Sequence, residues 1–258
     1  MGTQKTKGEE KMNDPMIVPT SQGDVEINIQ GKRKVLVKVS GGADSAILLY
    51  MLAKYRTEYN PDIEFIITSS EHALRPYQFE FAKKVIEVVQ RHYSLGDYEH
   101  IKNHNRGGEY YDADMEKMNL PLLDDEHTVQ FMGITANPSI EELTEYMNTI
   151  GASDNFAAIN NDFVATREKD RDLDHPDRFP KKEAEIAPGV YKFNRPFARV
   201  NKNAVAEVYD YFGMREELFP VTRSCEDSTN DFSSHCGRCW FCHERRLGFG
   251  HFDPLLGV

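Results

Sequence analysis

Short apolar runs alternate along the chain with stretches of helical spacing, and this order predicts an α/β fold. The runs at 34–39, 63–68 and 128–135 are rich in β-branched residues, which is typical of strands buried on both faces of a parallel sheet. Apolar residues at helical spacing follow the first two runs, at 46–55 and 77–92. Strands and helices in this order predict a parallel sheet with right-handed crossovers and helices on both faces.

Weaker patterns predict the remaining elements. Alternating residues within 16–31 predict a short hairpin, and the acidic residues after Ser139 mark a helix start. A further helix is expected over 203–213, where Gly213 ends the apolar spacing. Residues 100–126 have no clear period, so we predict only a loop and a short helical turn there.

These patterns divide the chain into three parts. Residues 1–15 are polar and lack the apolar core of a signal peptide, so we expect a flexible tail. Residues 16–222 would form the α/β domain, within which 151–190 is an irregular insertion, either a lid over the site or a disordered segment. The third part, 223–258, is a small helical segment that contains all the cysteines.

A turn between a predicted strand and a predicted helix carries the clearest chemistry. Residues 40–45 are Ser-Gly-Gly-Ala-Asp-Ser, in which adjacent glycines leave no side chain between the backbone amides and a ligand. The N–H groups of the helix start suit a phosphate, and Ser40 and Ser45 add hydroxyl donors. Asp44 would repel a phosphate unless a cation lies between them, so we predict Mg²⁺ there. The simpler alternative is a plain turn in which Asp44 or Ser45 caps the helix.

The complete motif resembles the pyrophosphate loop, or PP-loop, of the ATP pyrophosphatases, and the Walker A pattern is absent. The resemblance implies a Rossmann-like fold of the adenine nucleotide alpha-hydrolase type. It also implies cleavage of ATP between the α and β phosphates, with adenylation of an acceptor. The loop residues that would bind the nucleotide are Ser40, Gly41, Gly42, Ala43, Asp44 and Ser45.

Composition restricts the class of protein further. The chain has 258 residues, and no apolar run approaches the roughly 20 residues of a membrane helix, so we expect a cytoplasmic protein without a membrane partner. Its formal net charge of −11 argues against a nucleic-acid partner. Four cysteines in a chain of this length do not form a disulfide framework.

The cysteines have the spacing of metal ligands, with gaps of ten, two and two residues. They are Cys225, Cys236, Cys239 and Cys242. We predict a structural zinc site that folds its own segment, with an iron–sulfur cluster as the main alternative. His235 and His243 flank the cysteines as substitute ligands or as neighbours of the site.

Three stretches together resemble one family: SGGADS, the run FNRPF to LFPVTRSC over 193–225, and CGRCWFCHERR at 236–246. The family is 7-cyano-7-deazaguanine synthase, which uses ATP and ammonia to convert a carboxyl group into a nitrile in queuosine biosynthesis. The resemblance implies a ligase with ATP, Mg²⁺ and Zn²⁺ as cofactors. Its partners would be a deazapurine-like carboxylate and ammonia.

Catalytic roles follow from the same resemblance. Asp44, Ser45 and Lys202 would be catalytic, and Arg195 would join the loop in binding the nucleotide. The departing pyrophosphate needs cations, and the candidates are Arg195, Arg199 and Lys202. The alternative for each of them is a solvated surface charge.

The region expected to bind the acceptor departs from the family. After the second strand the family carries Tyr-Gly-Gln-Arg-His, whereas residues 73–78 here are Ala-Leu-Arg-Pro-Tyr-Gln. After the later strand it carries Ser-Gly-Tyr-Pro-Asp-Cys, whereas 138–141 here are Pro-Ser-Ile-Glu. His72 lies beside the first of these segments and either shapes the adenine or acceptor pocket or is a polar loop residue. The acceptor therefore stays open.

Other classes share parts of these motifs. They include a tRNA-thiolating or other RNA-modifying pyrophosphatase, an amide-forming ligase, a sulfate-nucleotide reductase, and an inactive nucleotide-binding module. The chain also has an apolar C-terminal tail, which we expect to dock against the core or, in a homodimer, against a second subunit. Its residues are Phe249, Phe252, Leu255 and Leu256.

Overall fold

The computed structural model describes residues 14–29, 31–106, 128–149, 171, 193–226, 235–237 and 239–251. Nearly all of the predicted tail and of the predicted insertion at 151–190 lies outside these residues, as do the last seven residues of the chain. Arg171 is the one residue of the insertion that the structure describes.

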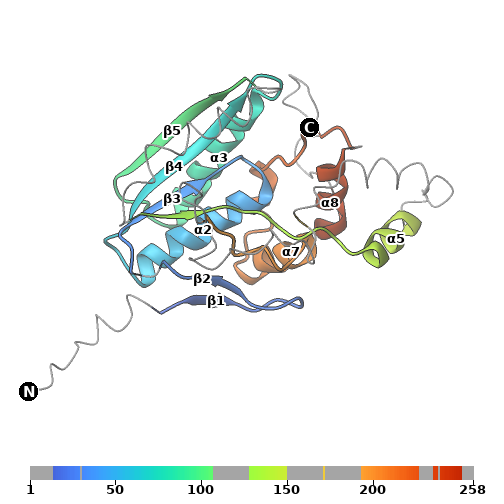
Figure 1. The fold of residues 1–258 in the computed structure, drawn as a ribbon, viewed down its shortest axis with the longest axis horizontal. Helices are drawn as coiled ribbons and strands as arrows, with labels where there is room; N and C mark the ends of the chain where they lie inside the picture. Colours follow the sequence, from blue (N-terminus) through green and yellow to red (C-terminus); the bar gives the residue numbers. More distant parts are fainter. Residues whose placement is uncertain are drawn as a thin grey trace, which may run out of the picture.

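A five-stranded sheet in which all neighbours run parallel forms the centre of the fold (Figure 1). The strand order is β5-β4-β3-β6-β7, so the chain moves from β3 to one edge and then returns to build the other. The strands are β3 (Lys34–Lys38), β4 (Glu64–His72), β5 (Tyr98–Asn105), β6 (Thr128–Phe131) and β7 (Phe193–Asn194). A parallel sheet flanked by helices confirms the predicted α/β class. The carboxyl ends of β3 and β6 form the switch point at which such sheets open a ligand crevice.

Strand β5 was not predicted, because its sequence gives no apolar period. It reads Tyr-Glu-His-Ile-Lys-Asn-His-Asn and has exposed or half-buried side chains along almost its whole length. Backbone pairing with β4 over eight residue pairs, from Phe65 to His72, places it in the sheet. The tertiary context therefore decides the structure of this segment, as is common for edge strands.

Helix α2 (Ala43–Glu58) lies at the centre of the main core. It is apolar on all sides, which is typical of a helix that is buried all round. The sheet and three other elements pack around it, and these are the hairpin formed by β1 (Met16–Val18) and β2 (Val25–Ile27), helix α3 (Tyr77–His92) and helix α7 (Lys202–Tyr211). The predicted hairpin and both predicted helices are thereby confirmed.

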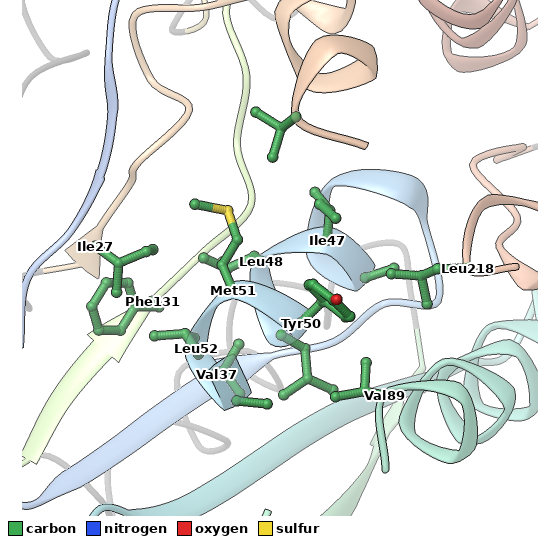
Figure 2. Close-up of a cluster of buried hydrophobic side chains, with 14 of the residues drawn as sticks. Ile27, Val37, Ile47, Leu48, Tyr50, Met51, Leu52, Val89, Phe131 and Leu218 are labelled. Carbon is green, nitrogen blue, oxygen red and sulfur yellow. The ribbon is translucent and has the colours of Figure 1, made fainter. Parts of the chain in front are cut away.

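Figure 2 shows this packing from within the core. Leu48 and Leu52 of α2 belong to one cluster with Val37 of β3 and Phe131 of β6. The side of the sheet that carries Val37 is therefore covered by α2. Because side chains alternate along a strand, the neighbouring residues Leu36 and Lys38 face the opposite side.

The C-terminal segment packs as a smaller unit beside α7. Helix α8 (Trp240–Phe249) follows the short 3-10 helix η6 (Phe219–Val221), and helix α5 (Ile140–Thr149) lies against α8 through a second apolar cluster (Figure 1). Ser139 and Glu142 form the predicted helix start, since each side chain bonds the backbone N–H of the other. At the other end of α8, Phe249 stacks on Phe219 in the main core, as expected for this residue of the tail.

The described helices include none that is both long enough and apolar enough to cross a bilayer.

The position of Leu48 gives a test of this core. Leu48 is fully buried between the helix and the sheet, so Leu48→Ala should lower the free energy of unfolding by about 2–5 kcal/mol. Leu74 is 55% exposed, and Leu74→Ala should change it by no more than about 0.5 kcal/mol. Urea denaturation followed by circular dichroism measures both, and equal effects would contradict the assigned packing.

Candidate functional site

A cavity of about 390 Å³ lies at the carboxyl ends of β3, β4 and β6. Its wall contains the Ser40–Ser45 loop, the segment 132–135 after β6, the segment 223–226 and residues of α8. Among the described lining residues, five are Lys or Arg and three are Asp or Glu, although the whole chain has a net charge of −11. The cavity is therefore a locally cationic part of an acidic protein.

The loop fits closely against helix α3. Gly41 has a φ of +81°, and a Cβ atom there would lie 2.7 Å from Cβ of Phe81. Only glycine combines this backbone conformation with this contact. Ser45 Oγ accepts a hydrogen bond from the Ser40 N–H at 3.1 Å and donates to the Gly42 carbonyl at 3.1 Å. The turn is thus held by its own two serines.

The carboxylate of Asp44 does not cap helix α2. No side chain caps the helix at Gly42. Asp44 instead accepts hydrogen bonds on both oxygens from Nζ of Lys202, at 2.6 Å on Oδ1 and 2.5 Å on Oδ2. The side chains of Lys202 and Asp44 are 4% and 18% exposed. Two residues predicted to be catalytic, 158 positions apart, therefore meet in one largely buried ion pair.

Two glycines allow this ion pair to form. A Cβ atom on Gly133 would lie 2.8 Å from the backbone of Asp44 and Ser45, and one on Gly248 would lie 2.4 Å from the carbonyl oxygen of Lys202. The loop after β6 and helix α8 therefore press directly on the two partners. Neither glycine was singled out from the sequence, because the need for it arises from chain segments that meet only in the fold.

The first N–H groups of α2 have weak partners. The Gly42 N–H reaches Ser40 Oγ at 3.3 Å, and the Ala43 N–H reaches Ser224 Oγ at 3.4 Å. Both distances lie beyond the usual range of an N–H to oxygen hydrogen bond. An anion at the helix start would therefore gain these donors at little cost.

The segment before the cysteines adds an arginine that sequence analysis missed. The Arg223 N–H donates to the Gly41 carbonyl at 2.7 Å, so this segment lies directly on the loop. The Arg223 guanidinium is buried in the cavity wall, 4.0 Å from the centre of the Tyr77 ring. In the sequence, its signals were its place in the LFPVTRSC run and its position two residues before Cys225.

A second missed arginine joins the loop after β6 to helix α8. Arg171 donates to both Thr135 oxygens, to the carbonyl at 3.0 Å and the hydroxyl at 2.7 Å. It also forms an ion pair with Glu244 at 2.6 Å, and the side chains of the pair are 5% and 1% exposed. Arg171 and Glu244 therefore connect two walls of the cavity, the segment after β6 and helix α8.

Arg245 forms a further link between α8 and the loop. It is fully buried, its guanidinium lies 3.8 Å from the Phe219 ring centre, and it donates to Thr222 Oγ1 at 2.8 Å. It also donates to Ser224 Oγ at 3.3 Å, the hydroxyl that contacts the first turn of α2. The cysteine-bearing helix therefore supports the loop through side chains as well as through backbone packing.

The four cysteines come together, as the spacing predicted. The sulfur atoms of Cys225, Cys236, Cys239 and Cys242 all lie within 4.8 Å of one another, and the distance from Cys236 Sγ to Cys242 Sγ is 3.8 Å. The described residues form no other group of three or more potential ligands, and this group includes neither flanking histidine. His243 instead contacts the Tyr146 hydroxyl through Nδ1 at 3.0 Å. Burial, and secondly Arg245, lower the pKa of His235 to about 3.

The electrostatics of the thiols favour a bound cation. A hydrogen bond with Cys225 is the main factor that raises the pKa of Cys239 to about 12, and the same partner raises that of Cys242. The raised pKa values of Cys239 and Cys242 favour their protonated thiols, and a metal ion would replace those protons.

The remaining predicted residues are placed as follows. His72 lines the cavity and is 6% exposed, and burial, with a smaller effect of Arg75, lowers its pKa. Arg195 is half-buried and Arg199 exposed, and neither is among the described lining residues. Lys38, which the sequence analysis did not single out, does line the cavity. Its only sequence signal was a charge at the end of an apolar strand.

A family model matches the part of the chain that carries the loop. Residues 16–108, about a third of the chain, match the family model described as a PP-loop domain. This part of the chain is therefore similar to a PP-loop domain, and the Ser40–Ser45 loop lies within it at the carboxyl end of β3.

The comparison with curated proteins found no match to this chain. Among solved structures, the U34-tRNA thiolase NcsA from Methanococcus maripaludis with its 4Fe-4S cluster is similar, at 13% identity and a TM-score of 0.46. The match covers 89% of this chain and 74% of that one.

The Arg171–Glu244 pair gives a test of how the cavity is held together. Glu244→Gln removes the charge partner of a buried guanidinium, so we expect a loss of about 3–5 kcal/mol in the free energy of unfolding. Glu145, an exposed residue of the neighbouring helix α5, supplies the matched control, and Glu145→Gln should have little effect. Chemical denaturation measures both variants, and a loss below about 1 kcal/mol for Glu244→Gln would contradict the assigned role.

Proposed function

We propose that this chain is an ATP-dependent ligase that adenylates a carboxylate and uses ammonia to convert it first to an amide and then to a nitrile, as 7-cyano-7-deazaguanine synthases do. The observation that carries the proposal is the pairing of Asp44 with Lys202 at the start of helix α2, inside a cationic cavity. A plain helix cap needs neither the lysine nor the cavity.

The loop is suited to pyrophosphate. The Gly42 and Ala43 N–H groups have only long contacts with hydroxyl groups, and a phosphate oxygen would replace those contacts with stronger ones. Lys202 lies at the same helix start and would neutralise charge that develops on the leaving pyrophosphate. The positive end of the α2 dipole adds to this effect.

Mg²⁺ fits the same arrangement. Asp44 offers carboxylate oxygens at the mouth of the loop, and Mg²⁺ in nucleotide sites takes one or two carboxylates together with phosphate oxygens. When bound, the ion would neutralise phosphate charge. Lys202 holds the carboxylate in place in the free protein, so Asp44 would exchange part of this ion pair for the metal.

The proposed reaction needs two activations by ATP, first of the carboxylate and then of the amide. An oxygen of the acceptor carboxylate attacks the α-phosphorus, and the bond to pyrophosphate breaks. Ammonia then attacks the acyl carbon, a proton is lost and AMP leaves, which gives the amide. The amide oxygen attacks the α-phosphorus of a second ATP, and loss of pyrophosphate, AMP and two protons gives the nitrile.

The acceptor is proposed to be a deazapurine-like carboxylate. The cationic lining of the cavity supports an anionic acceptor, and His72 and Arg75 lie on the wall that departs from the family. A salt bridge from Arg75 to Glu226 connects this wall to the segment that carries Cys225.

We further propose that the cysteines bind one Zn²⁺ ion in a structural role. Four thiolates around one zinc ion at about 2.3 Å stand about 3.8 Å apart, which is the Cys236–Cys242 distance. In a four-iron cluster each cysteine binds a different iron atom, so the sulfurs must spread further apart. All four ligands come from this chain, which leaves no position for a catalytic water.

Turnover assays test the function. Wild-type protein with ATP, Mg²⁺, ammonia and a 7-deazaguanine carboxylate should release AMP and pyrophosphate and form the nitrile, which mass spectrometry detects. AMP formed only with another carboxylate would move the assignment to a different ligase. Nucleotide binding without AMP under any of these conditions would favour a sensor, and AMP formed only with tRNA and a sulfur donor would favour a thiolase.

The variant Asp44→Asn keeps the shape of the loop but removes the charge that Mg²⁺ requires. We expect it to abolish the release of pyrophosphate, a loss of at least about 100-fold. The circular dichroism spectrum at room temperature should stay unchanged, although the melting temperature falls because Lys202 loses its charge partner. Asp62→Asn, at the opposite end of the sheet, is the matched control and should leave turnover unchanged. Pyrophosphate release by Asp44→Asn at the wild-type rate would refute the assignment of this residue.

Metal analysis tests the cysteine site separately. The purified protein should contain one zinc and no inorganic sulfide, and removal of the metal should lower the melting temperature. Cys236→Ser should have the same effect, because loss of one ligand weakens a site whose binding energy, roughly 10–16 kcal/mol, helps to fold its segment. Iron and sulfide in a four-to-four ratio would establish the cluster instead.

A further inference from the structure

The cavity-facing side of the sheet carries polar side chains next to the PP-loop. The register of β3 and β4 places Lys38 beside Thr68, and both residues line the cavity. Thr68 is 1% exposed, and its hydroxyl has no hydrogen-bond partner within the described structure. On β6, the amide of Gln130 is on the same side of the sheet, 2% exposed, and likewise lacks a partner among the described residues.

Such groups are unfavourable in the free protein. A buried hydroxyl or amide without a partner costs about 1–3 kcal/mol relative to one that is hydrogen-bonded. Because most buried polar groups in proteins are satisfied, an exception on a cavity wall calls for a partner from outside the chain, such as a ligand oxygen or an ordered water. Thr68 meets this condition directly, since it is both buried and part of the wall.

Lys38 adds a positive charge to the same spot. It lies two residues before Ser40, so its ammonium group is close to the loop. Burial, and secondly the charge of Arg195, lower the pKa of Lys38 to about 8. Lys38 ends β3, and β6 separates β3 from β7, the strand that Arg195 follows. The positive charge of Arg195 repels that of Lys38. An anion between or beside the two cations would relieve this repulsion.

We propose that Lys38 and Thr68 form an anion subsite beside the PP-loop, separate from the loop amides, which binds an anionic oxygen of the substrate. The subsite rests on the proposed function for its two sources of such an oxygen, the α-phosphate of ATP and the carboxylate of the acceptor. Lys38 Nζ would donate a charge-assisted hydrogen bond and Thr68 Oγ1 a neutral one. Both groups would hold the oxygen at the point where the loop positions the reacting phosphate.

Proton linkage distinguishes this role from a merely structural one. A lysine with a pKa of about 8 is half protonated at pH 8, and an anion raises that pKa, so binding should take up about half a proton at this pH. His72, whose pKa is lowered, stays neutral there. The other charged groups that line the cavity or act on Lys38 are Arg195 after β7, Asp44 on α2, Lys202 on α7, Arg75 after β4, Arg171, Arg223, Glu226 and Glu244.

The experiment is calorimetric titration of the full chain at pH 8. One arm uses Mg²⁺ and α,β-methylene-ATP, an analogue that cannot be cleaved between the α and β phosphates. The other arm uses the 7-deazaguanine carboxylate. Each titration is run in two buffers of different ionisation enthalpy, so that affinity and proton uptake are both obtained. The arm that shows proton uptake identifies the source of the oxygen.

Three variants separate the possible roles of the two side chains. Lys38→Met should weaken binding in that arm roughly 10- to 100-fold and abolish proton uptake. Lys38→Arg should keep the affinity within about 5-fold of wild type but also abolish uptake, because arginine does not titrate at this pH. Thr68→Val should weaken binding roughly 3- to 10-fold yet raise the melting temperature of the free protein, because it removes an unsatisfied buried hydroxyl.

Lys34→Met is the matched control. Lys34 lies on the same strand and the same side of the sheet, four residues earlier, at the end away from the cavity. It should alter neither affinity nor proton uptake. Lys38→Met with wild-type affinity and uptake in both arms would overturn the subsite and leave the proposed function intact. Binding and uptake as expected, but no AMP with any acceptor, would overturn the function and support the subsite. Absence of binding in both arms would overturn both.

Discussion

The ion pair between Asp44 and Lys202 is the interaction on which the rest of the site depends. It joins the first turn of the central helix to the first turn of α7, and it is largely removed from water. Isolated charges at this depth would be costly, so each residue requires the other in the free protein. The tight contacts at Gly133 and Gly248 show that the surrounding segments are shaped to hold the two side chains together. The loop is therefore assembled by the whole fold.

The C-terminal segment supports this assembly from two directions. The backbone N–H of Arg223 donates a hydrogen bond to the Gly41 carbonyl. The side chain of Arg245 donates to the Ser224 hydroxyl, which in turn contacts the Ala43 N–H. Because Cys225 and Cys242 lie within a few residues of these contacts, a metal at the cysteines would stiffen the same supports. If a metal strengthens these supports, any gain in affinity for a ligand at the loop would be matched by an equal gain in affinity for the metal.

Local patterns in the sequence were enough to predict the sheet strands with apolar runs, the helices with regular spacing, the loop and the grouping of the cysteines. Strand β5 was missed because its residues alternate between polar types and its place is decided by pairing with β4. Arg171 and Arg223 were missed for a related reason, since a buried arginine has no sequence pattern and its value depends on partners such as Glu244 and Tyr77. Arg199 is exposed and is not among the described lining residues, and charge alone cannot tell an exposed arginine from one that lines a cavity.

The close packing of Gly248 on Lys202 also has a consequence for biosynthesis. During translation the PP-loop, α2 and most of the sheet emerge first, whereas the glycine that backs the lysine belongs to the last helix described. A growing chain thus carries the phosphate loop long before it can hold Asp44 and Lys202 in their final geometry. The final geometry of the ion pair is therefore expected only when α8 has docked beside α7.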